Sequence, residues 1–148
     1  MKKTVITIIM ASLLTSYSVY AKRVHYEKWY QKQWCQEQSG ETEKVMNDGT
    51  RCDCRTETHA VEMDFANKWY EAVGQSLHYS LQTGKRAGIV LILESPNDKK
   101  YWERLINIVD QSKLSIDVWA VGDGVDSEIP QPYEGENNQE GNNCLVRS

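Results

Sequence analysis

Carboxylates on one predicted strand are the residues of this sequence that are most directly suited to chemistry. Between residues 58 and 65, Glu62 and Asp64 alternate with the apolar Val61, Met63 and Phe65. Successive side chains of a strand point to opposite faces, so one face is acidic and the other apolar. Two carboxylates side by side on the sheet of a small domain require a cation to offset their charge.

Two further acids are expected to extend this cluster. Asp53 lies on the preceding segment and Glu43 on the one before that. Several carboxylate oxygens with room for water form the ligand set that Mg²⁺ takes, and Mn²⁺ accepts the same ligands. The sequence therefore predicts that Glu43, Asp53, Glu62 and Asp64 hold Mg²⁺, with Mn²⁺ as a substitute. The alternative is that these acids are solvated on an open sheet face.

A lysine and two polar residues follow on the next predicted helix. Lys68 lies about one turn into it, where its ammonium can reach the acids, and a lysine beside a metal cluster can orient water or stabilise phosphate charge. Gln75 and Tyr79 follow on the same helical stripe. The alternative is an amphipathic helix with an ordinary polar flank.

The periodicity of the chain predicts a sheet flanked by helices. Asn47-Asp48-Gly49 separates two short extended segments, which is typical of a hairpin, and the aliphatic run 88–93 is typical of a strand buried on both faces. Ser95 and Pro96 have the pattern of a helix start. The order is helix 26–38, strands 42–46, 50–55 and 58–65, helix 66–82, strand 88–93, a helix to about 112 and strand 115–121. This order predicts an α/β or α+β domain, in which a sheet has helices on its faces.

The first residues are typical of a secretory signal peptide. Lys2 and Lys3 precede an apolar run too short to span a bilayer, and Val19-Tyr20-Ala21 resembles a cleavage site. We therefore expect a signal peptide at 1–21, export to the periplasm or the medium, and no membrane attachment after cleavage. One domain is predicted at 22–122, and the polar, acidic segment 123–148 is expected to be disordered unless Cys144 is bridged.

Four cysteines in an exported chain of this size predict disulfides. Cys52 and Cys54 are not expected to pair with each other, because residues two apart on a strand share a face at roughly 7 Å. Their partners are then Cys35 and Cys144, in either order.

This set of residues resembles the PD-(D/E)XK nuclease superfamily, over roughly residues 34–92. The family has an αβββαβ core with an Asp on the second strand, an acid on the third and Gln-x-x-x-Tyr on the following helix. The corresponding residues here are Asp53, Glu62, Gln75 and Tyr79. One departure is that Asp64 stands where the family pattern has a lysine, so Lys68 is the candidate replacement.

The resemblance implies an α/β, restriction-endonuclease-like fold with a mixed central sheet flanked by helices. It also implies Mg²⁺-dependent hydrolysis of nucleic acid, with DNA ahead of RNA. Asp53, Glu62, Lys68, Gln75 and Tyr79 would be the catalytic residues. One alternative is a secreted binding protein that keeps the fold and lacks hydrolysis. Another is a disulfide-bonded envelope protein whose acids are only surface groups, with a Cys35 bridge drawing the first helix over the acidic face.

Overall fold

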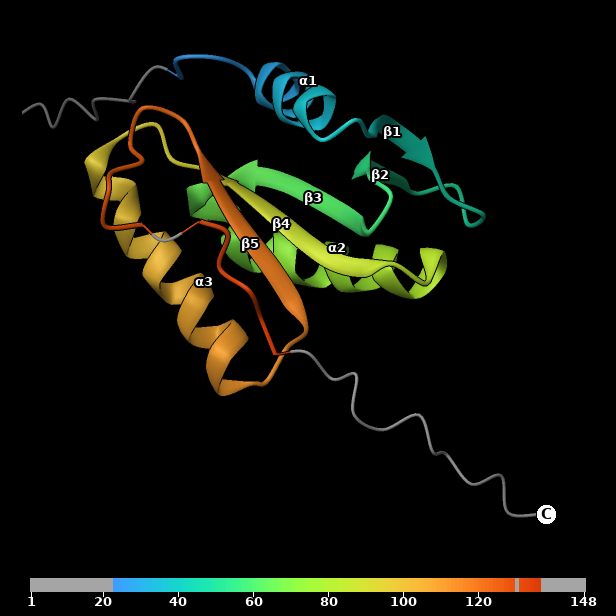
Figure 1. The fold of residues 1–148 in the computed structure, drawn as a ribbon. Coiled ribbons are helices and arrows are strands. Elements are labelled where there is room, and N and C mark those ends of the chain that lie inside the picture. Colours follow the sequence, from blue (N-terminus) through green and yellow to red (C-terminus); the bar gives the residue numbers. More distant parts are fainter. Residues whose placement is uncertain (1–22, 130, 137–148) are drawn as a thin grey trace, which may run out of the picture.

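A mixed five-stranded sheet with helices on both faces forms the protein (Figure 1). The computed structural model describes residues 23–129 and 131–136, so the predicted signal peptide lies outside the described residues. The elements begin and end within a few residues of the predicted boundaries: α1 Glu27–Glu37, β1 Glu41–Val45, β2 Arg51–Arg55, β3 His59–Phe65, α2 Trp69–Thr83, β4 Arg86–Ile92, α3 Lys99–Gln111 and β5 Ile116–Val121. Short 3-10 turns at Ala66–Lys68 and Pro96–Asp98 lead into α2 and α3.

The strands lie side by side in chain order, β1-β2-β3-β4-β5. The hairpin strand β2 is antiparallel to both of its neighbours, whereas β3, β4 and β5 are parallel. The aliphatic strand β4 lies between β3 and β5 and is buried from Ala87 to Ile92, as its sequence predicts. The carboxyl ends of the three parallel strands therefore meet at one edge of the sheet.

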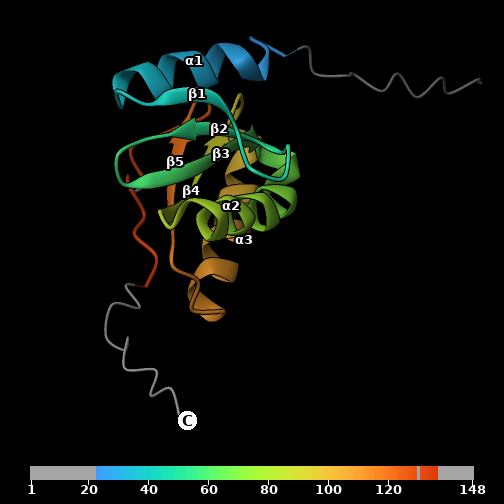
Figure 2. The same cartoon turned by 90° about the vertical axis from the view of Figure 1, so that its right-hand side faces the viewer.

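Helix α1 covers one face of the sheet, and α2 and α3 cover the other (Figures 1 and 2). On the α1 side, Tyr30 and Trp34 pack on Val61, Met63 and Phe65 of β3. On the opposite side the buried residues of α3 pack on β4 and β5. The apolar face of β3 therefore lies under α1, which confirms the predicted alternation. None of the helices in the described part of the chain is long and apolar enough to cross a membrane.

Strands β2 and β3 separate after a short ladder. Their paired residues are Cys54 with Val61 and Arg55 with Ala60. Further along, the amide of Met63 donates instead to the side chain of Asp53, with N···Oδ2 2.9 Å. The two strands thus leave a gap, in which a side chain rather than a backbone carbonyl accepts the hydrogen bond from the amide of β3.

A disulfide joins α1 to β2. Cys35 and Cys54 are bonded with a Cα–Cα distance of 5.7 Å, which is one of the two pairings left open by the sequence. The expectation that Cys52 and Cys54 share a face is wrong. Cys54 lies in the core under α1, whereas the buried Cys52 packs with Met46 on the side of α2, beyond the point where β2 stops pairing with β3. Cys144 lies outside the described residues.

The C-terminal segment is ordered further than predicted. Ile129 is buried, and the backbone of Tyr133 exchanges hydrogen bonds with Val118 on the outer edge of β5. The amide of Gly135 donates to Asp117. The expectation of disorder from residue 123 is therefore wrong for 123–129 and 131–136. Composition missed this segment because edge pairing through backbone groups requires few apolar side chains.

Candidate active site

Four carboxyl groups gather in the gap between β2 and the second half of β3. Glu62 and Asp64 are 6% and 3% exposed, so these predicted site residues are buried rather than solvated. Asp53 enters the gap from β2, and Glu27 approaches it from the first turn of α1. We call Glu27, Asp53, Glu62 and Asp64 the acidic cluster. Because Glu62 and Asp64 are buried, the alternative in which these two acids are solvated on an open sheet face is wrong.

Asp53 and Glu62 form the inner pair of the acidic cluster. Burial, followed by the charges of Asp53 and Asp64, raises the pKa of Glu62 well above its ordinary value. Burial also raises the pKa of Asp53, against the hydrogen bond from the amide of Met63. Oε2 of Glu62 is buried and finds no hydrogen-bond partner among the described residues. A buried carboxylate oxygen of this kind is satisfied either by a proton or by a cation.

Glu27 and Asp64 form the outer pair, which Lys68 joins. The Lys68 ammonium lies 3.4 Å from Oδ1 of Asp64, and the charge of that carboxylate raises the pKa of Lys68. Burial and then the charge of Asp64 raise the pKa of Glu27 to about 7. Lys68 is therefore in contact with the acidic cluster through Asp64, the residue that stands where the nuclease family has its lysine.

Sequence reasoning missed Glu27. Its helix was predicted, but only the aromatic stripe of that helix was interpreted, and nothing in the local spacing relates Glu27 to a strand 35 residues later. The available signal was an acid in the first turn of a helix that precedes the hairpin of an αβββαβ order. Only the packing of α1 on β3 brings its carboxyl to Asp64.

Glu43 lies beside the acidic cluster and is paired with two cationic side chains. Its carboxylate is 3.2 Å from Arg51 and 3.8 Å from Lys28, and it accepts a hydrogen bond from the side chain of Gln31. Its charge raises the pKa of Asp53, so it is close to the gap. Its φ of 53° is a conformation that non-glycine residues adopt with strain. The predicted ligand role of Glu43 would require exchanging these ion pairs for a metal.

Gln75 and Tyr79 approach the gap from α2. The Tyr79 hydroxyl donates to Oε1 of Gln75 at 3.5 Å, which confirms that they share a helical stripe. Tyr79 is buried, and burial together with the charges of Glu62 and Asp53 raises its pKa far above the ordinary value. The phenol is therefore a neutral hydrogen-bonding group beside the acids at physiological pH.

No family model, no curated protein and no solved structure matches the chain. The chemistry of the site is therefore inferred from its residues and their geometry.

The acidic cluster offers carboxyl oxygens from three elements, and oxygen atoms of this kind are the ligands that Mg²⁺ and Mn²⁺ prefer. Within residues 23–129 and 131–136, no three His, Cys, Asp or Glu side chains are arranged as a preformed metal site. Asp53 is turned toward the Met63 amide, while Oε2 of Glu62 has no partner. Side-chain rotation of Asp53 and Glu62 would be needed to bring their oxygens onto one ion.

The acidic cluster predicts an unusual dependence of stability on pH. Glu27, Asp53 and Glu62 have raised pKa values, so the folded protein keeps protons that the unfolded chain has released. Their stabilising contribution is complete below pH 4 and is lost as pH rises through the folded pKa values, about 7 for Glu27. We expect the free energy of unfolding to fall by about 1 kcal/mol per pH unit between pH 5 and 7.

Urea unfolding monitored by circular dichroism at half-unit pH steps, in a metal-free buffer, measures this slope. Glu62→Gln should flatten it, because the amide does not titrate. A matched control is Glu57→Gln, which removes an exposed carboxyl far from the gap and should leave the slope unchanged. A free energy of unfolding that rises from pH 5 to 7 in all three proteins would contradict the protonated state of the acidic cluster.

Proposed function

We propose that this protein is an exported, metal-dependent nuclease that hydrolyses phosphodiester bonds of nucleic acid. The observation that carries the proposal is the buried acidic cluster, in which Glu62 has an unpartnered oxygen and Lys68 contacts Asp64. Buried carboxylates without matching cations reduce stability, so a function is the simplest reason to keep them.

The arrangement of elements supports the proposed restriction-endonuclease-like fold. The order α1-β1-β2-β3-α2-β4 is the αβββαβ order that the resemblance implies. The family's two acids correspond to Asp53 on β2 and Glu62 on β3, which flank the gap where these strands separate. Gln75 and Tyr79 lie on the next helix, with Tyr79 beside the acids. Topology, strand assignment and the helix motif agree with one another.

Asp53 and Glu62 would hold the metal in this proposal, with Asp64 as a further oxygen ligand. A bound Mg²⁺ supplies positive charge for the scissile phosphate and lowers the pKa of a water molecule. Lys68 holds an ammonium against Asp64, where it can orient the attacking water or stabilise charge on the phosphate. Tyr79 and Gln75 supply neutral hydrogen-bonding groups for the site or for the substrate backbone.

The disulfide supports the proposed export. Disulfides persist in oxidising compartments, and the Cys35–Cys54 bond fixes α1 to the hairpin strand that carries Asp53. It also holds the helix over the apolar face of β3. In this proposal the disulfide keeps two walls of the site together outside the cytoplasm.

The number of protons released when a metal ion binds tests the proposal. Because the acids share protons in the metal-free protein, Mn²⁺ must displace them, and binding at pH 7 should release roughly one proton per ion. Isothermal titration calorimetry with Mn²⁺ in two buffers of different ionisation enthalpy measures this number. Glu62→Gln should weaken binding at least about tenfold, whereas Glu57→Gln should not change it. Binding equally tight in both variants, or no binding at millimolar Mn²⁺, would favour a non-catalytic binding protein.

A further inference from the structure

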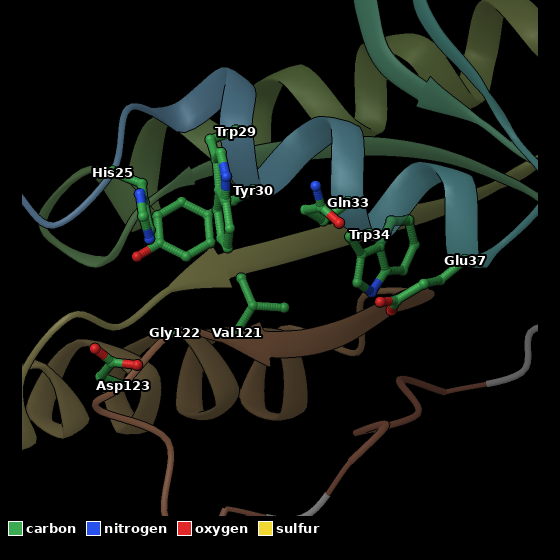
Figure 3. A pocket seen from close by; sticks show the side chains of 9 residues that line it. All are labelled: His25, Trp29, Tyr30, Gln33, Trp34, Glu37, Val121, Gly122 and Asp123. Atoms are coloured by element: carbon green, nitrogen blue, oxygen red, sulfur yellow. The ribbon is translucent and has the colours of Figure 1, made fainter.

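A cavity that none of the acidic-cluster residues lines lies beside α1. It has a volume of about 390 Å³ and opens between α1 and the end of β5, with Val121 in its wall (Figure 3). Cavities of this size hold small organic groups. It also lies at the carboxyl end of a parallel strand, where open α/β sheets bind their ligands. Position and volume thus both suit a ligand that the acidic cluster does not account for.

Aromatic rings line this cavity and are held in place by one another. Trp29 stacks on His25 with ring centroids 3.8 Å apart and meets the edge of Tyr30 at 5.0 Å. Trp34 packs at 5.3 Å from Trp119 of β5. Trp29 nevertheless remains 42% exposed. A fixed aromatic surface left open to solvent is suited to binding a flat or positively charged group.

Two acids lie at opposite ends of the cavity (Figure 3). Glu37 lies at the end of α1 and Asp123 follows β5, and both side chains are exposed. The cavity wall contains neither Lys nor Arg, and no Lys, Arg or His nitrogen of the described residues lies within 4.0 Å of either carboxylate. The nearby Glu94 carboxylate accepts from the Tyr30 hydroxyl at 3.3 Å and lies 4.0 Å from Arg23, so the unpaired negative charge at the cavity is that of Glu37 and Asp123. The electrostatic potential in the cavity therefore favours a cation.

We propose that this cavity binds an organic cation, a guanidinium or alkylammonium group, against the exposed ring of Trp29, with Glu37 and Asp123 at either end of the cavity. The aromatic ring attracts such a group through its quadrupole, and the two carboxylates attract it through their charge. A nucleotide is disfavoured, because its phosphate would lie near two unpaired carboxylates. This inference is independent of the nuclease proposal, since none of these residues belongs to the acidic cluster.

Indole N–H signals in ¹H–¹⁵N NMR spectra of the full folded protein at pH 7.5 provide the test. Capped arginine (N-acetylarginine methylamide) and spermidine are the two probes. The first represents a cationic side chain of a protein, and the second represents a free polyamine. Capped citrulline is the uncharged control. We expect the signals of Trp29 and Trp34 to shift with at least one probe, and not with citrulline.

Variants of Glu37 and Asp123 test whether binding of the cation requires their negative charge. Glu37→Gln and Asp123→Asn should each weaken binding about threefold, and the double variant about tenfold, because each removes one partly screened attraction. Glu57→Gln is the matched control and should bind as the parent protein does. The proposal would be overturned if neither cation shifts the signals at about 20 mM. It would also be overturned by an equal response to capped citrulline or by unchanged binding in the double variant.

Discussion

Glu62→Gln is expected to lower metal-dependent cleavage of nucleic acid on the order of 10³-fold. The amide keeps the shape of the side chain but removes the negative charge that the proposed ion requires. The loss should appear as a lower rate at saturating substrate, because in this proposal Glu62 would contact the ion rather than the nucleic acid. Initial rates with a fluorescent oligonucleotide at several Mn²⁺ concentrations measure it.

The same change should stabilise the metal-free protein, by about 2 kcal/mol at pH 8. At pH 8 the buried carboxyl of Glu62 must take up a proton that the unfolded chain has released, and the neutral amide avoids this cost. A lower cleavage rate together with a higher free energy of unfolding would indicate that Glu62 serves function rather than the fold. A Glu62→Gln protein that is both less stable and fully active would show that Glu62 serves the fold.

Lys68→Ala is expected to reduce the cleavage rate about 10²-fold while leaving Mn²⁺ affinity nearly unchanged. The Lys68 ammonium contacts Asp64 but is not a metal ligand, so its loss affects water or phosphate positioning rather than ion binding. The pKa of Asp64 should rise further in this variant, because Lys68 opposes the effect of burial on that carboxyl. Cleavage in the variant should therefore require a higher pH.

Lys100→Ala is the matched control for this prediction. Lys100 is an exposed lysine on α3, which lies beyond the sheet from α1, and its ammonium lies over the ring of Tyr101. Its removal changes the net charge by the same amount without touching the acidic cluster. Equal losses of activity in both variants would indicate a general effect of charge on nucleic acid binding and would exclude a positioning role specific to Lys68.

Local patterns predicted the elements that carry the site. The alternation in β3 placed Glu62 and Asp64 opposite the apolar residues under α1, and the period of α2 placed Gln75 and Tyr79 on one stripe. The aliphatic run of β4 identified a strand buried within the sheet. Each of these features depends on residues close in sequence, where period and face follow from backbone geometry alone.

Features that depend on distant contacts were not predictable. Glu27 reaches Asp64 only because α1 crosses β3, and Cys52 leaves the face of Cys54 only because β2 departs from its ladder. Glu43 is ion-paired with Arg51 of the neighbouring strand β2, whose register partner is Val45, a detail set by the positive φ of Glu43 and by side-chain rotamers. Tyr133 joins the edge of β5 through its backbone, which leaves no pattern in the side chains.

Nuclease activity of the purified protein tests the central proposal most directly. The chain would be produced with its own N-terminal segment, recovered from the periplasm of a bacterial host with its disulfide intact, and incubated with plasmid DNA, single-stranded DNA and RNA in Mg²⁺, Mn²⁺ or EDTA. The proposal predicts cleavage of DNA that requires the metal and is lost in Glu62→Gln and Lys68→Ala but kept in Glu57→Gln and Lys100→Ala. No cleavage of any substrate by the folded protein, or cleavage that persists in EDTA or in Glu62→Gln, would contradict it.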